Sequence, residues 1–339
     1  INFSDKKIIQ KIFNKSNLRN ASNQKLLVAS VFNKNEKPFN YSGVSINTKT
    51  IKKNNLFFAI RGKKMDGHSY IKEAIRKGAV KAVVSKKISK SKKNKTIKVK
   101  NTFSTLNKLA KLSRSISSAK IIGVTGSVGK TTLKNLISFS LKNYGKVYHS
   151  PYSYNNKFGV PISLSNLKKN IEFGVFEIGM DKKGEINTLS KMVRPDIAII
   201  TNISEAHLKN FKSIKDIARA KAEIISNIPI HGNIILNKDD RFFNFLSDLA
   251  KKKRISITSF GSKKRADIFL VNIHKIKNTY RLKISVKNKI FFFTTKNITN
   301  NFISNILACV AVLSVLNLDL ENIKNLFSNF YLPTGRGDI

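Results

Sequence analysis

Residues 123–132 read Gly-Val-Thr-Gly-Ser-Val-Gly-Lys-Thr-Thr, and this stretch decides the fold. It overlaps an apolar run at 121–124 that predicts a strand, and it opens a helical pattern over 131–143. Glycines let backbone N–H groups close around phosphates, and the helix N-terminus adds partial positive charge. The usual pattern has a glycine six residues before the lysine; here that position is Val124, with Gly123 one residue earlier. The stretch predicts a phosphate-binding loop (P-loop) in an α/β fold.

The loop supplies both a cation and a metal ligand for a bound nucleotide. Lys130 can reach the β- and γ-phosphates, and the Thr131 hydroxyl can ligate Mg²⁺. ATP and Mg²⁺ are therefore the expected cofactors. The candidate ATP-binding residues of the loop are Gly126, Ser127, Val128, Gly129, Lys130, Thr131 and Thr132.

Strand and helix patterns alternate after residue 120, which is typical of βαβ units and a parallel sheet. The strand patterns cover residues 121–124, 173–178, 196–201 and 233–236, and the helical ones cover 131–143, 184–192, 213–226 and 239–251. An additional β segment follows at 254–259, 267–274, 279–286 and 289–295, and helices are predicted at 302–316 and 320–329. The patterns predict a P-loop, mostly parallel-sheet ATP-binding domain.

A small mixed α/β domain is predicted before it. Short strands are expected at 44–46, 56–60 and 79–84, with a helix at 70–77, and the Lys/Ser run at 86–95 lacks aromatic residues and reads as a solvated loop. The predicted domains are a lead-in segment at 1–40, this small N-terminal domain at 41–115, the central ATP-binding domain at 116–330 and a short final segment at 331–339.

Polar residues follow two apolar strands of the central domain. Glu177 ends the strand pattern at 173–178, and His207 comes shortly after the pattern at 196–201. Parallel sheets of this kind bind ligands at the carboxyl ends of their strands, so both side chains are expected at the edge that holds the P-loop. Mg²⁺ prefers hard oxygen ligands. Glu177 is therefore predicted to share a metal site with Thr131, and His207 is a further candidate.

The charge is the most unusual property of the composition. Among 339 residues, 64 Lys+Arg stand against 19 Asp+Glu, a formal net charge of +45. Abundant Lys and Asn without Trp is typical of compositional drift on solvated surface, and we take drift as the main cause. Residues 172–240 are the exception, since ten acidic and ten basic side chains balance there. A non-enzymatic alternative is a basic P-loop protein that binds nucleic acid.

Cysteine use and hydropathy bear on the compartment. The only cysteine, Cys309, lies in an apolar run at 306–313, which excludes a disulfide framework and fits a reducing environment. That run is too short to cross a bilayer, and the N-terminus lacks a secretory signal. A cytoplasmic protein without an integral membrane segment is expected.

The chain resembles the ATP-dependent Mur ligases from about Gly43 to Arg336. Residues 43–68 look like the family's uridine-nucleotide-binding domain, and 126–132 match its nucleotide loop. The most discriminating segment is 154–161, Tyr-Asn-Asn-Lys-Phe-Gly-Val-Pro, because ligases that add other peptide residues differ there. The resemblance implies joining of D-alanyl-D-alanine to UDP-N-acetylmuramoyl-tripeptide through an acyl phosphate, in peptidoglycan precursor synthesis, by a monomer that binds no nucleic acid.

The resemblance also implies roles for individual residues. By spacing alone Lys221 reads as a solvated helix lysine, but the matching family lysine is carbamylated and ligates Mg²⁺ together with a histidine, here His207. Asn305 matches a residue that contacts adenine, and Arg336 matches a hinge arginine near the nucleotide. The implied catalytic residues are Lys130, Lys221 and His207, and the implied substrate-binding residues are Ser45, Asn47, Thr48, Asp66, Gly67, His68, Asn155 and Asn156.

Several alternatives stay open within the enzyme class. They are the Mur ligase that adds the third peptide residue and a folylpolyglutamate synthase-like ligase, both of which share the loop. The family also has a third, C-terminal domain beyond the segment matched here, so we expect residues 1–339 to be inactive without it. The lead-in faintly resembles the tail of the preceding ligase in the pathway, which suggests a fused pair of ligases.

Overall fold

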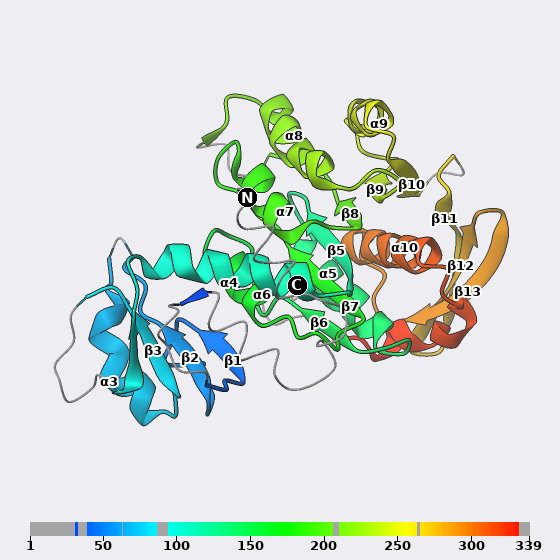
Figure 1. Ribbon diagram of the computed structural model, residues 1–339. Helices are drawn as coiled ribbons and strands as arrows, with labels where there is room; N and C mark the ends of the chain where they lie inside the picture. The colour runs from blue at the N-terminus through cyan, green and yellow to red at the C-terminus, as the bar shows by residue number, and fades with distance from the viewer. Residues whose placement is uncertain are drawn as a thin grey trace, which may run out of the picture. The chain divides into compact units, whose positions relative to one another are not determined.

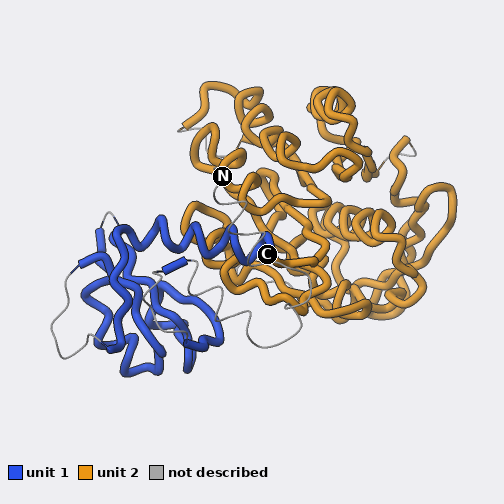
Figure 2. Tube along the Cα trace, in the orientation of Figure 1, with its two compact units in different colours: residues 1–115 blue, residues 116–339 orange. Residues whose placement is uncertain are grey.

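The computed structural model describes residues 31–32, 39–62, 64–86, 94–205, 210–262 and 265–331. The chain divides into two compact units, Ile1–Ser115 and Ile116–Ile339 (Figure 2). Each unit has its own sheet, with four strands in the first and nine in the second. The predicted fold class, a small α/β unit followed by a mostly parallel P-loop sheet with an extra β segment, is confirmed.

The first unit is built on an all-parallel sheet. Its strands, in spatial order, are β1 (Gly43–Ser45), β2 (Asn55–Phe58), β3 (Lys81–Val84) and β4 (Thr96–Lys98). The described part of this unit includes the helices η1 (Gly67–Tyr70), α3 (Ile71–Arg76) and α4 (Thr102–Ile116). All four residues of β2 are buried, as is typical of a strand in a parallel sheet that is covered on both faces. Phe57 and Ala59 belong to the same core cluster as Ala74 of α3. β4 and α4 were not predicted.

The second unit carries a nine-stranded sheet in the order β13-β12-β11-β10-β9-β8-β5-β7-β6. Pairing is parallel from β6 to β11 and antiparallel for β11, β12 and β13. The strands are β5 (Lys120–Thr125), β6 (Val147–His149), β7 (Phe173–Glu177), β8 (Ile197–Ile200), β9 (Asn233–Asn237), β10 (Ser256–Gly261), β11 (Ile268–Ile276), β12 (Thr279–Val286) and β13 (Lys289–Thr295).

Helices cover both faces of this sheet (Figure 1). α5 (Lys130–Leu141) and α10 (Asn300–Val315) pack together on one face. The other face is covered by α6 (Gly159–Ser165), α7 (Glu185–Val193), α8 (Ile214–Ala222), which η4 (Glu223–Asn227) extends, and α9 (Phe243–Lys252). Every residue of α10 from 306 to 313 is buried, as expected of a helix that is apolar all round.

The strand order reverses at β5, and this reversal positions the site. β7 lies on one side of β5 and β8 on the other, so the chain leaves β5 toward one half of the sheet and later returns to the other half. Ligands bind in such sheets at the carboxyl ends of the strands where the order reverses. The P-loop follows β5 directly, at that point.

The structure differs from the predicted elements in three places of the second unit. β6 and α6 were not predicted: β6 has only three half-buried residues, and α6 contains Gly159 and Pro161, which are poor helix formers. The helix predicted at 320–329 is wrong, since two separate 3-10 turns, η5 (Leu320–Ile323) and η6 (Leu326–Asn329), stand there. Among the described residues, no helix has the length and apolar character needed to cross a membrane.

Candidate functional site

The P-loop depends on two glycines with positive φ. Gly126 has φ +146°, and a Cβ on it would lie 1.8 Å from Oγ1 of Thr201. Gly129 has φ +83° and is the N-cap of α5, and a Cβ there would lie 3.0 Å from Oδ1 of Asn305. Any side chain at either position meets both backbone strain and a neighbour. The loop between β5 and α5 therefore requires glycine at both positions, and Asn305 lies beside Gly129.

Residues 201–204, which follow β8, are hydrogen-bonded to the P-loop at Ser127 and Val128. The Ser127 amide donates to the Asn202 carbonyl (2.9 Å), and the Val128 amide donates to Oδ1 of the same asparagine (2.9 Å). The Ser127 hydroxyl donates to the Ser204 carbonyl (3.1 Å), and the Thr201 hydroxyl donates to the Val128 carbonyl (2.7 Å). The sequence patterns gave no role to these residues of 201–204, although they hold the loop in shape.

Lys130 begins α5, and its ammonium turns back onto the loop. Its Nζ donates to the carbonyls of Gly126 (2.8 Å) and Ser127 (3.0 Å). The ammonium thus lies against the loop that is expected to bind phosphate, which is compatible with the phosphate contact predicted for it.

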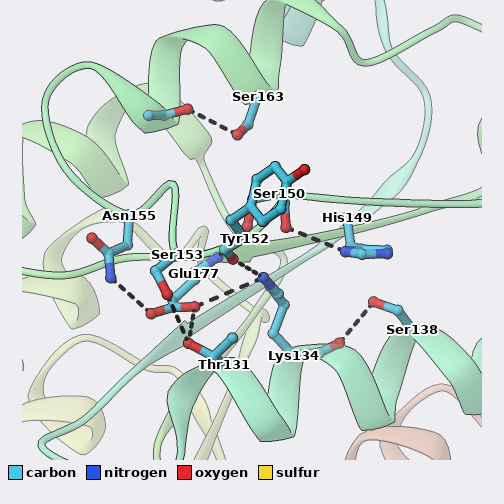
Figure 3. A network of polar contacts seen from close by, with 11 residues as sticks. Thr131, Lys134, Ser138, His149, Ser150, Tyr152, Ser153, Asn155, Ser163 and Glu177 are labelled. Atoms are coloured by element: carbon cyan, nitrogen blue, oxygen red, sulfur yellow. Dashed lines mark hydrogen bonds and ion pairs between the residues drawn. The ribbon is translucent and has the colours of Figure 1, made fainter. Parts of the chain in front are cut away.

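The Glu177 carboxylate joins three elements at the carboxyl end of β7 (Figure 3). The Thr131 hydroxyl donates to Oε2 (2.7 Å), and the Asn155 side-chain amide donates to Oε1 (2.7 Å). The Ser150 hydroxyl accepts the Glu177 backbone N–H (3.2 Å), and the Ser153 hydroxyl lies 3.4 Å from that of Thr131. Glu177 is 1% exposed, so its carboxylate is bound by these neighbours instead of by bulk water, and the contacts fix its orientation.

Asn156 has a structural role of its own in the same segment. Its Oδ1 accepts the backbone N–H groups of Phe158 and Gly159, both at 3.0 Å, at the start of α6. The structure therefore brings Asn155 to the Glu177 carboxylate and places Asn156 at a helix N-terminus.

A residue that was not predicted, Lys134, completes this cluster. It lies one helical turn after Lys130, it is fully buried, and its Nζ is 3.9 Å from Oε2 of Glu177. Nζ also donates to the backbone carbonyl of Tyr152. In a chain with so many lysines, only the four-residue spacing from Lys130 distinguishes Lys134 in the sequence.

The donor set around Glu177 fits a magnesium ion. A carboxylate and a threonine hydroxyl 2.7 Å apart, with a serine hydroxyl nearby, are hard oxygen ligands. Mg²⁺ usually takes only one or two protein carboxylates and completes its shell with phosphates and water. No group of three or more His, Cys, Asp or Glu side chains suited to a metal occurs among the described residues.

Lys221 is buried near the end of α8 and is 2% exposed. Burial lowers its pKa from 10.5 to about 7, and the positive charge of Lys130 adds to this shift. A substantial fraction of this lysine is therefore neutral near pH 7, the form that reacts with electrophiles. His207 and Arg336 lie outside the described residues.

Glu223, two residues after Lys221, links the end of α8 to the start of α7. The Glu223 carboxylate accepts N–H groups from Gly184 (2.7 Å) and Asn187 (3.0 Å) at the N-terminus of α7. A carboxylate stabilises a helix N-terminus by capping its free amides. The contact fixes the end of α8 relative to α7.

The predicted substrate-binding residues of the first unit lie at the carboxyl edge of its sheet. Ser45 ends β1, and its hydroxyl donates to the Asn47 carbonyl (3.0 Å) while accepting the Asn47 amide (3.1 Å). Thr48 is buried in the same turn, and its carbonyl accepts a hydrogen bond from Lys77 (3.1 Å). These residues form one ordered turn after β1.

Asp66, Gly67 and His68 form a second turn at that edge, after β2. His68 Nδ1 lies 2.6 Å from Oδ1 of Asp66, and the Ser85 amide donates to His68 Nε2 (3.0 Å), which places the ring proton on Nδ1. The pKa of Asp66 is held well below its usual range, mainly by the hydrogen bond from the Lys86 ammonium and, to a smaller extent, by the hydrogen bonds from His68. His68 is thereby tied to two loops of its own unit.

Comparisons with known proteins agree with this geometry. Residues 40–114 match the Mur ligase family, catalytic domain, and residues 124–313 match the Mur ligase middle domain. The UDP-N-acetylmuramoyl-tripeptide–D-alanyl-D-alanine ligase of Rickettsia prowazekii is 36% identical over 301 residues, which is 88% of this chain and 67% of the relative.

The solved structures that resemble this chain include two MurF proteins. MurF from Acinetobacter baumannii superposes with a TM-score of 0.79 at 26% identity, over 92% of this chain and 69% of that one. MurF from Thermotoga maritima, in complex with ADP, has a TM-score of 0.72 at 26% identity, over 87% of this chain and 67% of that one. The P-loop unit, the parallel-sheet unit before it and these likenesses together show that the chain belongs to the Mur ligase family.

Proposed function

We propose that the chain carries the ATP-binding and UDP-substrate-binding parts of an ATP-dependent ligase that joins D-alanyl-D-alanine to UDP-N-acetylmuramoyl-tripeptide in peptidoglycan precursor synthesis. One observation carries the proposal: a single carboxylate, Glu177, accepts hydrogen bonds from P-loop Thr131 and from Asn155 of the discriminating segment 154–161. The Rickettsia relative, of which the chain spans 67%, is named for this reaction.

Amide formation from a carboxylate and an amine in water is uphill, so the carboxylate must first be activated. The γ-phosphoryl of ATP is transferred to the terminal carboxylate of the tripeptide, giving ADP and an acyl phosphate. The D-alanyl-D-alanine amine then attacks the acyl carbon, and the tetrahedral intermediate loses inorganic phosphate and a proton to leave the amide. Catalysis of phosphoryl transfer rests mainly on positioning and on stabilising charge.

The P-loop supplies that stabilisation. In the proposed reaction, the N–H groups at the start of α5 and the Lys130 ammonium would bind the phosphates and balance the negative charge that develops on the transferred group. The Asn305 side chain lies beside Gly129, which supports the base contact that the resemblance implies for it, and we assign binding of the UDP end of the other substrate to the turns at 45–48 and 66–68.

Thr131 and Glu177 would hold one Mg²⁺, and His207 with a modified Lys221 would hold a second. The ions, when bound, neutralise phosphate and carboxylate charge and so reduce the repulsion between two anionic substrates. The low pKa of Lys221, about 7, supports its modification. The neutral amine adds to carbon dioxide and loses a proton, which gives a carbamate with carboxylate-like oxygens.

We place this reaction in the cytoplasm, with the two substrates as partners and a monomeric enzyme. The test is an assay of the full-length gene product with UDP-N-acetylmuramoyl-tripeptide, ATP and Mg²⁺. Phosphate release that depends on D-alanyl-D-alanine is expected. Release with diaminopimelate or lysine and the dipeptide precursor would assign the neighbouring Mur reaction instead, and release with a folate and glutamate would assign folylpolyglutamate synthesis. Salt-sensitive DNA binding without any such release would favour the nucleic-acid alternative.

A further inference from the structure

Lys134 is fully buried in the second unit, although lysine is one of the residues least often buried. Its side chain is 1% exposed, and the Glu177 side chain beside it is 2% exposed. A buried cation is unfavourable unless it is paired and hydrogen-bonded. Lys134 meets both conditions, with Oε2 of Glu177 at 3.9 Å and the Tyr152 carbonyl as acceptor (Figure 3).

The backbone at Tyr152 is strained. Its φ is +47°, which a bulky residue rarely adopts, and the residue is 70% exposed, so burial of the side chain does not stabilise this conformation. Such strain persists only where surrounding contacts hold it. The hydrogen bond from Lys134 to the Tyr152 carbonyl is such a contact.

The strained residue lies in the loop that carries two site contacts. Ser153 follows it directly and reaches the Thr131 hydroxyl, and Asn155 donates to Glu177. The Lys134 ammonium therefore contacts both the Glu177 carboxylate and the loop whose Asn155 donates to that carboxylate. α5 delivers Lys130, Thr131 and Lys134 together, so the same helix supplies the phosphate contact, the hydroxyl ligand and the buried counter-ion.

We propose that Lys134 is a positioning residue that fixes the Glu177 carboxylate and the strained loop at Tyr152 for metal and nucleotide binding. Its enclosed ammonium acts through these neighbours and does not contact the substrates. The role in turnover rests on the proposed function, whereas the coupling to Glu177 and Tyr152 does not depend on it.

The first test measures thermal unfolding of the full-length protein without nucleotide or Mg²⁺. Lys134→Met should lower the unfolding temperature, because it leaves the Glu177 carboxylate buried without its counter-ion. The double variant Lys134→Met, Glu177→Gln should recover part of that loss, since both charges are gone. Lys142→Met, at the exposed end of the same helix, is the matched control and should behave as wild type. Additive losses in the double variant would overturn the coupling to Glu177.

The second test follows chymotryptic cleavage after Tyr152 by mass spectrometry. Cleavage should be faster in Lys134→Met than in wild type or Lys142→Met, because the loop loses the contact that holds its strained residue. Cleavage at the wild-type rate would overturn the role in the loop. Neither of these two tests requires an active enzyme.

The third test separates metal use from substrate binding. Substitutions of residues that orient metal ligands typically cost about 10- to 100-fold in metal affinity or activity. Lys134→Met should raise the Mg²⁺ concentration for half-maximal phosphate release by a factor in that range, with the KM for D-alanyl-D-alanine unchanged. A raised dipeptide KM with an unchanged Mg²⁺ requirement would overturn the inference. If wild type itself releases no dipeptide-dependent phosphate, the proposed function fails, and the unfolding and cleavage tests still decide the role of Lys134.

Discussion

The Thr131 hydroxyl donates a 2.7 Å hydrogen bond to Oε2 of Glu177, so the first turn of the P-loop helix is joined directly to the end of the neighbouring strand β7. Both atoms are ligands of the kind that Mg²⁺ prefers. Hydrogen bonding between them keeps the pair in place before any ion binds, so that little rearrangement is required on binding.

Thr131→Val should therefore weaken metal use while keeping the fold. The substitution preserves side-chain shape but removes the hydroxyl, and about a 10- to 100-fold higher Mg²⁺ requirement for phosphate release is expected in the full-length enzyme. Thr131→Ser keeps the hydroxyl and should stay close to wild type. Equal Mg²⁺ titrations for the valine and serine variants would show that the hydroxyl is not a ligand.

Lys130→Ala should abolish phosphoryl transfer with little effect on folding. Removing one preorganised group that stabilises transition-state charge typically costs about 10²- to 10³-fold in kcat. The ammonium donates to the carbonyls of Gly126 and Ser127 in the loop, so its removal leaves the helix and sheet hydrogen bonds in place and far-ultraviolet circular dichroism should be unchanged. Phosphate release at the wild-type rate would refute the assignment.

The loop between β5 and α5 and the position of Glu177 at the end of β7 were predicted correctly, and both have a strong local signal in the sequence. The P-loop has fixed glycines, and Glu177 ends an apolar strand next to it in the sheet, so both follow from pattern and topology. Lys134 has no such signal, because its burial depends on Glu177 and Tyr152, which are distant in sequence. Similarly, α6 forms despite Gly159 and Pro161 because the unit buries all seven of its residues, and propensity alone cannot show that.

Lys221 should make stability depend on pH. Its pKa is about 7 in the folded chain and near 10.5 when exposed, so between these values the unfolded state binds more protons. The free energy of unfolding should rise with pH across this window, by about 1.4 kcal/mol per pH unit from this group. Lys221→Met removes the cost of burying a charge, so it should be more stable than wild type below pH 7. Denaturant titrations in carbon dioxide-free buffer at pH 6.5 to 10 measure the difference, which must shrink as pH rises; a constant difference would contradict the buried-charge argument.

Lys221→Ala should be inactive yet partly rescued by short carboxylic acids. A small carboxylate can occupy the space of the missing side chain and supply the oxygens that the carbamate would have provided. Phosphate release by the full-length variant should increase with acetate or propionate concentration. Lys253→Ala is a matched control, because Lys253 is also a partly buried lysine, its ammonium donates to the carbonyls of Ile225, Ser226 and Ile228, and no metal role is proposed for it. Phosphate release by Lys221→Ala that does not increase with either acid, or that increases no more than release by Lys253→Ala, would count against the carbamate.

Two glycines with positive φ should respond differently to alanine. Gly184→Ala meets no atom within 4 Å at φ +87°, so only the backbone penalty of about 1–2 kcal/mol applies. Gly126→Ala, at φ +146°, would also place its Cβ 1.8 Å from the Thr201 hydroxyl oxygen, which bonds the loop at Val128. It should cost clearly more unfolding free energy and should abolish binding of a fluorescent ATP analogue, whereas Gly184→Ala should bind it normally. Similar losses of stability and binding in both variants would show that the contact between Gly126 and Thr201 does not shape the phosphate loop.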